Sequence, residues 1–120
     1  MAYNKPELEF FDPINDPKYK VEAKPVKGYP DGITERVVSA DPESGDHTRY
    51  LYFEPGVETT ARLVHEYWEE VYIISGYLID KTLNKRFDAG MYCCRPPGML
   101  HGPYSTPEGC VTFEIHYWKK

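Results

Sequence analysis

The chain has 120 residues, a length that fits one domain with a single core and excludes two. Its 41% hydrophobic and 15% aromatic content predicts a folded chain, because that much apolar surface can offset the entropy lost on ordering. The net charge of −5 gives no overall field for attracting nucleic acid or an acidic membrane surface, so we expect neither as a partner.

Cysteine usage and the start of the chain bear on location. Three cysteines, two of them adjacent, do not make a disulfide framework, and the start lacks the basic-then-apolar pattern of a signal peptide. No apolar run approaches the ~20 residues that a membrane-spanning helix requires. We therefore expect a cytoplasmic protein.

Residues 1–30 are predicted to form an extended arm. Its prolines exclude a helix of any length: Pro6, Pro13, Pro17, Pro25 and Pro30. Only residues 7–11 predict a short strand. The arm either pairs with the edge of its own sheet or reaches a partner subunit, and the sequence leaves both open. We divide the chain into this arm and a β-barrel domain at residues 31–120.

From residue 31 onward, short strands alternate with turns. Residues 33–40 and 47–53 predict a hairpin around a loop of turn formers, and residues 57–64 lead toward the middle of the chain. Further strands are predicted over residues 77–80, 86–90, 91–95 and 110–118. Many short strands without a convincing helix are typical of a sandwich or barrel.

The stretch of residues 65–76 is the centre of the predicted domain. His65 and Glu69 lie four residues apart and lead into an apolar segment that ends at Gly76, where we expect a turn. A helical period also fits residues 62–75, but the β-branched and aromatic residues 71–74 favour a strand. Alternation allows only one of Glu69 and Glu70 to face inward. Farther along, His101 supplies a second imidazole, so two segments could bring three ligands to one point.

These two segments carry a resemblance to a known family. The second motif of the cupins is matched by Gly90, Pro96, Gly98 and His101 at its spacings, with Ser105 where an asparagine is usual. The first motif is matched by Gly56, His65, Glu69 and Gly76, with Leu63 in place of its first histidine, and the six-residue spacing to Gly76 favours Glu69 over Glu70. The resemblance covers about residues 33–118. The local sequence around Trp68, Arg95, His101 and Glu108 is similar to that of small single-domain bacterial cupins, which are related to the metal-binding cupin module of certain anti-sigma factors.

The resemblance implies an all-β fold, a cupin-type jelly-roll β-barrel that here carries the extended N-terminal arm. It also implies a divalent metal held by His65, Glu69 and His101. Two imidazoles and one carboxylate with open positions suit non-haem Fe(II), which we favour, while Zn²⁺ and Mn²⁺ also accept such a set. The sequence leaves open whether Leu63 weakens the metal, opens a further exchangeable position or marks a barrel without metal.

Other polar side chains are candidates for substrate contacts. Tyr104, three residues after His101, is placed to approach the metal. Arg49 shares a face with Leu51 and Phe53, so it would anchor an anionic substrate if that face points inward. The final strand carries apolar residues on one face and polar ones on the other, and the roles of His47, Glu114 and His116 stay open. Cys93 and Cys94 fall on opposite faces of one strand.

The expected function is that of a small metal-binding cupin, a dioxygenase-like metalloenzyme acting on a small organic substrate. The alternatives are a non-catalytic metal or ligand sensor, a metal-dependent lyase or isomerase, and a structural barrel with a decayed site. The substrate is not determined by the sequence. An edge strand in the arm and an aromatic-rich surface predict a homodimer.

Overall fold

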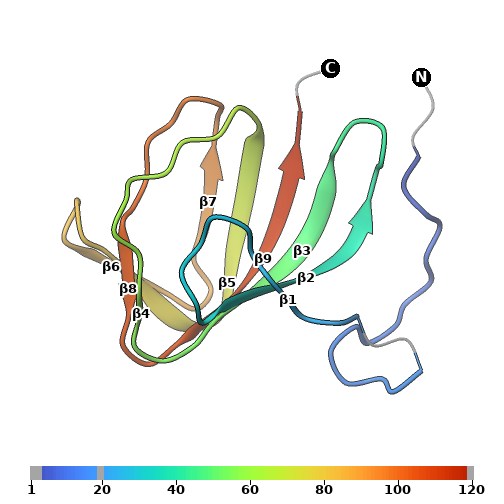
Figure 1. Ribbon diagram of the computed structural model, residues 1–120, viewed down its shortest axis with the longest axis horizontal. Helices are drawn as coiled ribbons and strands as arrows, with labels where there is room; N and C mark the ends of the chain where they lie inside the picture. The colour runs from blue at the N-terminus through green and yellow to red at the C-terminus, as the bar shows by residue number, and fades with distance from the viewer. Residues whose placement is uncertain (1–3, 19–20, 119–120) are drawn as a thin grey trace.

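The computed structural model describes residues 4–18 and 21–118, and within these ranges it contains strands and no helix. Figure 1 shows one antiparallel sheet that curls into a half-barrel. The expected all-β architecture is therefore confirmed. The strands are β1 (Lys24–Pro25), β2 (Ile33–Ala40), β3 (His47–Phe53), β4 (Val57–Glu58), β5 (Trp68–Asp80), β6 (Lys85–Asp88), β7 (Tyr92–Arg95), β8 (Tyr104–Thr106) and β9 (Cys110–Tyr117).

Strand β5 joins the two walls of the half-barrel. The strands follow the order β1-β2-β3-β9-β5-β8-β4, and β6 and β7 also pair with β5. The first half of β5 lies between β9 and β7, whereas its second half pairs with β6 and β8 (Figure 1). The register with β9 shifts between Ile73 and Ser75, as at a β-bulge, where a strand bends. One strand thus contributes side chains to both parts of the interior.

The structure differs from the sequence prediction at Gly76, where β5 continues and no turn forms. Gly76 has a φ of 74°, and a Cβ added there would lie 2.0 Å from the carbonyl oxygen of Gly109. The glycine is needed because two backbones approach each other closely, which is a second common reason for glycine in a strand. The strand prediction for residues 71–74, made against the helical alternative, is confirmed.

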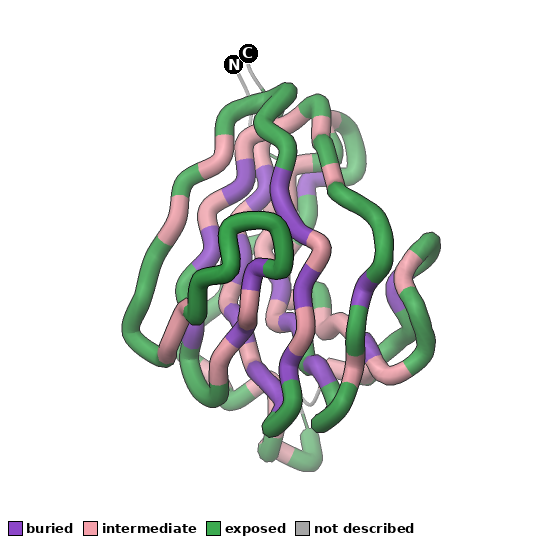
Figure 2. Tube along the Cα trace, turned by 90° about the vertical axis from the view of Figure 1, so that its left-hand side faces the viewer, coloured by how far each residue is buried: buried purple, intermediate pink, exposed green. Residues whose placement is uncertain are grey.

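The core lies inside the curl of the sheet. Buried residues run along the middle strands in Figure 2. The apolar cluster consists of Val26, Ile33, Leu51, Phe53, Ile73, Leu78, Tyr104 and Cys110. On β9 the polar face points inward: Thr112, Glu114 and His116 are buried, while Val111 and Phe113 are half-buried on the outer face. The interior is therefore unusually polar, and the outer face of the sheet is rich in apolar side chains.

The arm is extended but makes fewer sheet contacts than predicted. Residues 7–11 do not form a strand, and Phe10 is fully exposed. Lys24 and Pro25 instead form β1, which pairs with β2. Proline is tolerated there because β1 is an edge strand, where one side needs no N–H donor.

Two further strands near the end of the barrel differ from the prediction. β8 (Tyr104–Thr106) was not predicted, and β4 (Val57–Glu58) lies in residues 57–64, for which the sequence predicted no particular structure. Within the described residues, no helix has the length and apolarity needed to cross a membrane.

Replacing Gly76 with alanine should destabilise the protein by about 2–5 kcal/mol, because a positive φ costs a non-glycine residue about 1–2 kcal/mol and overpacking adds about 1–3. Urea denaturation measures the loss. Gly90→Ala is the matched control, because Gly90 has a φ of 92° but no atom within 4 Å of the added Cβ. We expect it to cost only about 1–2 kcal/mol. Equal losses in the two variants would show that the contact with Gly109 is unimportant.

Candidate metal centre

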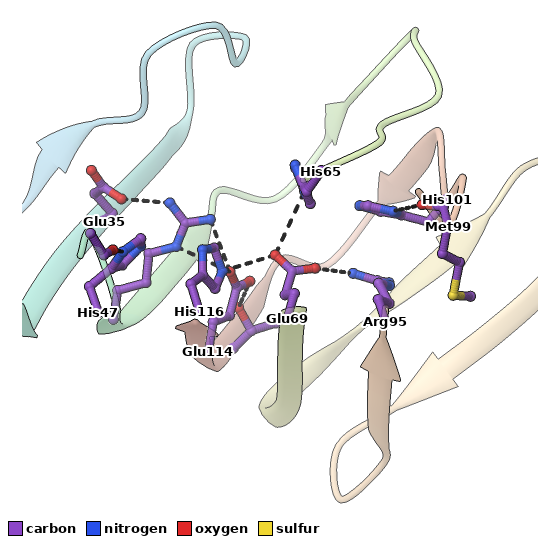
Figure 3. Close-up of polar contacts among 12 residues, drawn as sticks. Glu35, His47, His65, Glu69, Arg95, Met99, His101, Glu114 and His116 are labelled. Atoms are coloured by element: carbon purple, nitrogen blue, oxygen red, sulfur yellow. Dashed lines mark hydrogen bonds and ion pairs between the residues drawn. The ribbon is translucent and has the colours of Figure 1, made fainter. Parts of the chain in front are cut away.

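A buried carboxylate, that of Glu69 on β5, lies at the centre of the polar interior (Figure 3). Its side chain is 4% exposed. Its Oε1 accepts a hydrogen bond from Arg95 Nη1 at 2.7 Å, and its Oε2 lies 2.9 Å from His116 Nε2 and 3.8 Å from His65 Nε2. The neighbouring Glu70 is not buried and accepts a hydrogen bond from the hydroxyl of Tyr92. Glu69 is thus the inward-facing member of the pair, as the six-residue spacing to Gly76 indicates.

Strand register brings the partners of Glu69 to it. Arg95 on β7 and His116 on β9 are both direct cross-strand neighbours of Glu69. In an antiparallel sheet such neighbours have their Cβ atoms about 4.5–5.5 Å apart on the same face. The three side chains therefore form one row across the inner wall.

The two other predicted ligands come from the segments before β5 and before β8. Leu63 and His101 exchange backbone hydrogen bonds of 2.7 and 2.9 Å, which holds the two segments together. The rings of His65 and His101 consequently lie with their centroids 5.0 Å apart. One ligand atom from each of His65, Glu69 and His101 lies within 4.8 Å of the others. The structure brings together the trio that the resemblance implies.

The hydrogen bonds of both imidazoles suit a metal ion. His65 Nε2 is buried and has no hydrogen-bond partner among the described residues, which is costly for a buried polar atom unless something else occupies the position. His101 Nδ1 lies 3.3 Å from the carbonyl oxygen of Met99, to which it can donate. That bond leaves Nε2 with its lone pair, the tautomer that metal-bound histidines adopt. These residues fit a divalent cation.

Local electrostatics keep the trio in its metal-binding protonation states. Burial and, next in size, the charge of Arg95 together lower the pKa of His101 to about 4. Burial likewise lowers the pKa of His65, although the charge of Glu69 opposes this. Burial would raise the pKa of Glu69, but the hydrogen bond from His116 and the charge of Arg95 outweigh it and lower the pKa. Near pH 7 the trio is two neutral imidazoles and one carboxylate.

Arg49 and Glu114 form a second buried cluster beside this site, linked to it through His116. Arg49 donates to Glu114 Oε1 from Nε at 3.1 Å and from Nη2 at 3.0 Å, and to Glu35 from Nη1 at 2.6 Å. His116 Nε2 lies 3.1 Å from the same Glu114 oxygen. In Figure 3 this cluster lies on the opposite side of Glu69 from His101. Arg49 does face inward, as predicted if Leu51 and Phe53 do, but two carboxylates already match its charge.

A second trio with ligand spacing belongs to this cluster: Glu69, Glu114 and His116. Burial would lower the pKa of His116, but hydrogen bonds to Glu114 and Glu69 outweigh it and raise the pKa. Because a cation or N–H donor at His116 already lies between the two carboxylates, we assign no metal to this trio. His47, whose role the sequence left open, packs against His116 with ring centroids 4.5 Å apart and the ring planes tilted by 54°.

Tyr104 and Arg95 form the other side of the site. Arg95 Nη2 donates to the Tyr104 hydroxyl at 2.5 Å, and the Tyr104 ring centroid lies 6.3 Å from that of His101. The sequence placed Tyr104 near the metal but gave Arg95 no role. The available signal was alternation in residues 92–95, which puts Arg95 on the same face as Cys93. That signal is weak, because it does not say which face points inward.

Two neighbouring cavities adjoin these residues. The inner one, of about 30 Å³, is lined by Leu63, Glu69 and Glu114 among others. The larger, of about 420 Å³, is mostly apolar and is lined by residues that include Ile73, Phe87, Met91, Cys93 and Leu100. Both share the walls Val71, Leu78, Arg95, His101 and Tyr104. The larger cavity has the size of a small-molecule site, and His101 is among its walls.

Comparison with known proteins identifies the family. Residues 18–118 match the model of the ChrR cupin-like domain. No curated protein matches the sequence. Among solved structures, an RmlC-like cupin from Shewanella frigidimarina is 17% identical with a TM-score of 0.71, and covers 98% of this chain and 96% of its own.

Two other similar structures have named activities. The polyketide cyclase RemF from Streptomyces resistomycificus is 18% identical with a TM-score of 0.71, over 94% of this chain and 81% of its own. The acetylacetone dioxygenase from Acinetobacter johnsonii is 18% identical with a TM-score of 0.67, over 98% and 80%. At these identities the similarity establishes the fold and leaves the reaction undetermined.

Glu69→Gln should weaken binding of a divalent ion by at least ~100-fold. Loss of a residue that only hydrogen-bonds to a metal ligand already lowers metal affinity by about 10–100-fold, and Glu69 would be a ligand itself. Glu70→Gln is the matched control and should keep about one ion per chain, since that side chain faces outward. Zinc titration with elemental analysis measures both. His65→Ala and His101→Ala should behave like Glu69→Gln. Retention of zinc in both histidine variants, or equal loss in the Glu70 variant, would contradict the assignment.

Proposed function

Because the chain belongs to the family of ChrR cupin-like domains, we propose that it binds a divalent metal through His65, Glu69 and His101 and acts on a small organic molecule. The observation that carries the proposal is the buried, unpartnered Nε2 of His65, which faces Glu69 beside His101. Neutral imidazoles and an ionised carboxylate provide the donors, and the cavity of about 420 Å³ provides room for a substrate.

We favour Fe(II) as the ion and a dioxygenase as the reaction class. Two imidazoles and one carboxylate are the donor set of non-haem Fe(II) oxygenases, and they also suit Zn²⁺ or Mn²⁺. When bound, iron would supply Lewis acidity and the capacity to activate dioxygen. Leu63 lines the inner cavity beside Glu69 and His101, so it presents an apolar wall where a fourth protein ligand would otherwise lie.

Protein residues around the cavity would orient and shield the substrate. Tyr104 is 6% exposed and lines both cavities, so its hydroxyl is placed to contact the substrate directly. Arg49 would act as a positioning residue, because it reaches Glu69 only through Glu114 and His116. Val71 and Leu78, both buried, would exclude water from the reacting atoms.

Anaerobic reconstitution with Fe(II), followed by oxygen-electrode assays on catechols, dicarbonyls and hydroxy acids, should give oxygen uptake with at least one substrate. Glu69→Gln should reduce uptake to background, and Glu70→Gln should not. Tight ligand binding without oxygen uptake would favour a non-catalytic sensor. Turnover with Zn²⁺ and without oxygen would favour a lyase or isomerase. Failure to bind any divalent ion would overturn the proposal.

We also propose that the chain forms a homodimer. The outer face of the sheet carries exposed aromatic side chains, including Tyr52, Tyr72 and Tyr92, and apolar neighbours on β9. Contiguous apolar surface of this kind is typical of association sites. Light scattering at micromolar concentration should give about twice the monomer mass of 13.9 kDa. Tyr72→Glu should shift the protein toward monomer, and a wild-type mass of one chain would contradict the proposal.

A further inference from the structure

Arg95 is a buried cation whose hydrogen-bonding capacity is only partly used. Its guanidinium offers five N–H donors, of which one binds Glu69 and one binds Tyr104, so three have no protein partner among the described residues. Its side chain is 14% exposed and lines both cavities. An arginine placed between a carboxylate and an apolar cavity is suited to bind a planar anionic group.

Tyr104 extends the same donor surface. Its hydroxyl oxygen accepts the bond from Arg95 Nη2, which leaves the phenolic hydrogen to be donated elsewhere. Burial raises the pKa of Tyr104, so the phenol keeps that hydrogen at neutral pH. Tyr104 is among the residues that line both cavities. An oxygen atom in the larger cavity could therefore accept hydrogen bonds from Arg95 and Tyr104 together.

The charges next to Arg95 favour an anionic group beside it. Arg95 pairs with one carboxylate, that of Glu69, whereas Arg49 pairs with two, those of Glu35 and Glu114. A divalent ion on His65, Glu69 and His101 would add two positive charges at this place. Glu69 would then share its charge between the ion and Arg95, leaving the guanidinium incompletely neutralised. An anionic group beside Arg95 would compensate this charge in a place where unpaired charge is costly.

The remaining walls restrict the rest of the ligand. Val71, Ile73, Leu78 and Phe87 line the larger cavity with apolar surface. The one buried carboxylate among its walls, Asp80, accepts backbone hydrogen bonds from Thr82 at 2.9 Å and Leu83 at 3.0 Å, which stabilise the turn after β5. Asp80 is thus engaged by the turn, and the apolar walls suit a hydrocarbon or aromatic body.

We infer that Arg95 and Tyr104 form an anion-binding pair, and that the substrate is a small molecule with one anionic oxygen group next to an apolar body. The inference rests on the proposed function, since it describes the substrate of the same site. Arg95 and Tyr104 would hold the anionic group beside His101, and the apolar body would fill the cavity of about 420 Å³.

The test compares two probes of equal shape, 3-phenylpropanoate and its neutral amide 3-phenylpropanamide. Their binding is measured by calorimetry on zinc-loaded protein at pH 7, where zinc avoids redox turnover. The carboxylate should bind at least ~10-fold more tightly, because charge-assisted hydrogen bonds discriminate by about that factor or more. Absence of carboxylate binding at millimolar concentration would overturn the inference.

Variants separate the anion-binding pair from direct binding of the carboxylate to zinc. Arg95→Met should reduce the preference for the carboxylate by at least ~10-fold, and Arg95→Lys should restore part of it. Tyr104→Phe should reduce the preference for the carboxylate by ~3–10-fold while zinc is retained. If Arg95→Met does not fold, this milder variant tests the anion-binding pair on its own. Arg86→Met is the matched control, because Arg86 is exposed and pairs with Asp88 outside the cavity.

Zinc content, measured on the same samples, distinguishes the two proposals. One outcome is that the folded Arg95 and Tyr104 variants keep zinc and still prefer the carboxylate as strongly as the wild type does. The anion-binding pair would then be wrong, while the metal site would stand. If the wild type binds no zinc, the proposed function is wrong. A carboxylate preference in that metal-free protein, lost in Arg95→Met or Tyr104→Phe, would then still support the pair on its own.

Discussion

The ionised carboxylate of Glu69, buried inside the half-barrel, is the constraint on which the rest of the interior depends. Removing such a charge from water costs several kcal/mol unless partners compensate for it. The partners come from the two strands that flank the first half of β5: Arg95 from β7 and His116 from β9. Any shift of register by one residue would turn these side chains outward and leave Glu69 unpaired. The buried charge of Glu69 thus favours one register of β5 with β7 and β9.

The sheet holds a row of charged side chains inside, beside its apolar core, and carries aromatic residues on its outer face. The inner charges are nearly all satisfied: Arg49 bonds to Glu35 and Glu114, and Thr112 donates to Glu114 at 2.9 Å. Three buried polar atoms lack a partner among the described residues: His65 Nε2, Thr106 Oγ1 and His116 Nδ1. Only the first belongs to the trio of His65, Glu69 and His101, and a bound ion there would offset the cost of leaving it unpaired.

Local signals in the sequence predicted much of the fold. Alternation and turn residues located β2 and β3 with the observed bounds, and motif spacing selected Glu69 over Glu70. The features that were missed depend on contacts between distant segments. Gly76 is required by its approach to Gly109, and Arg95 acquires its place from pairing with Glu69 across the sheet. Alternation on β9 was visible, but only the curled sheet shows that its polar face points inward.

The bend in β5 explains how one barrel combines a polar centre with an apolar cavity. The first half of the strand contributes Glu69 to the charged row, and its second half contributes Leu78 to the larger cavity. Val71 lies between them and lines both cavities. Structures of similar fold include a cyclase and a dioxygenase, so the shared barrel alone does not select a reaction. The choice of reaction must depend on the residues between the two cavities. Among these, Arg95, His101 and Tyr104 are the polar ones, and they line both the inner cavity that contains Glu69 and the larger apolar cavity.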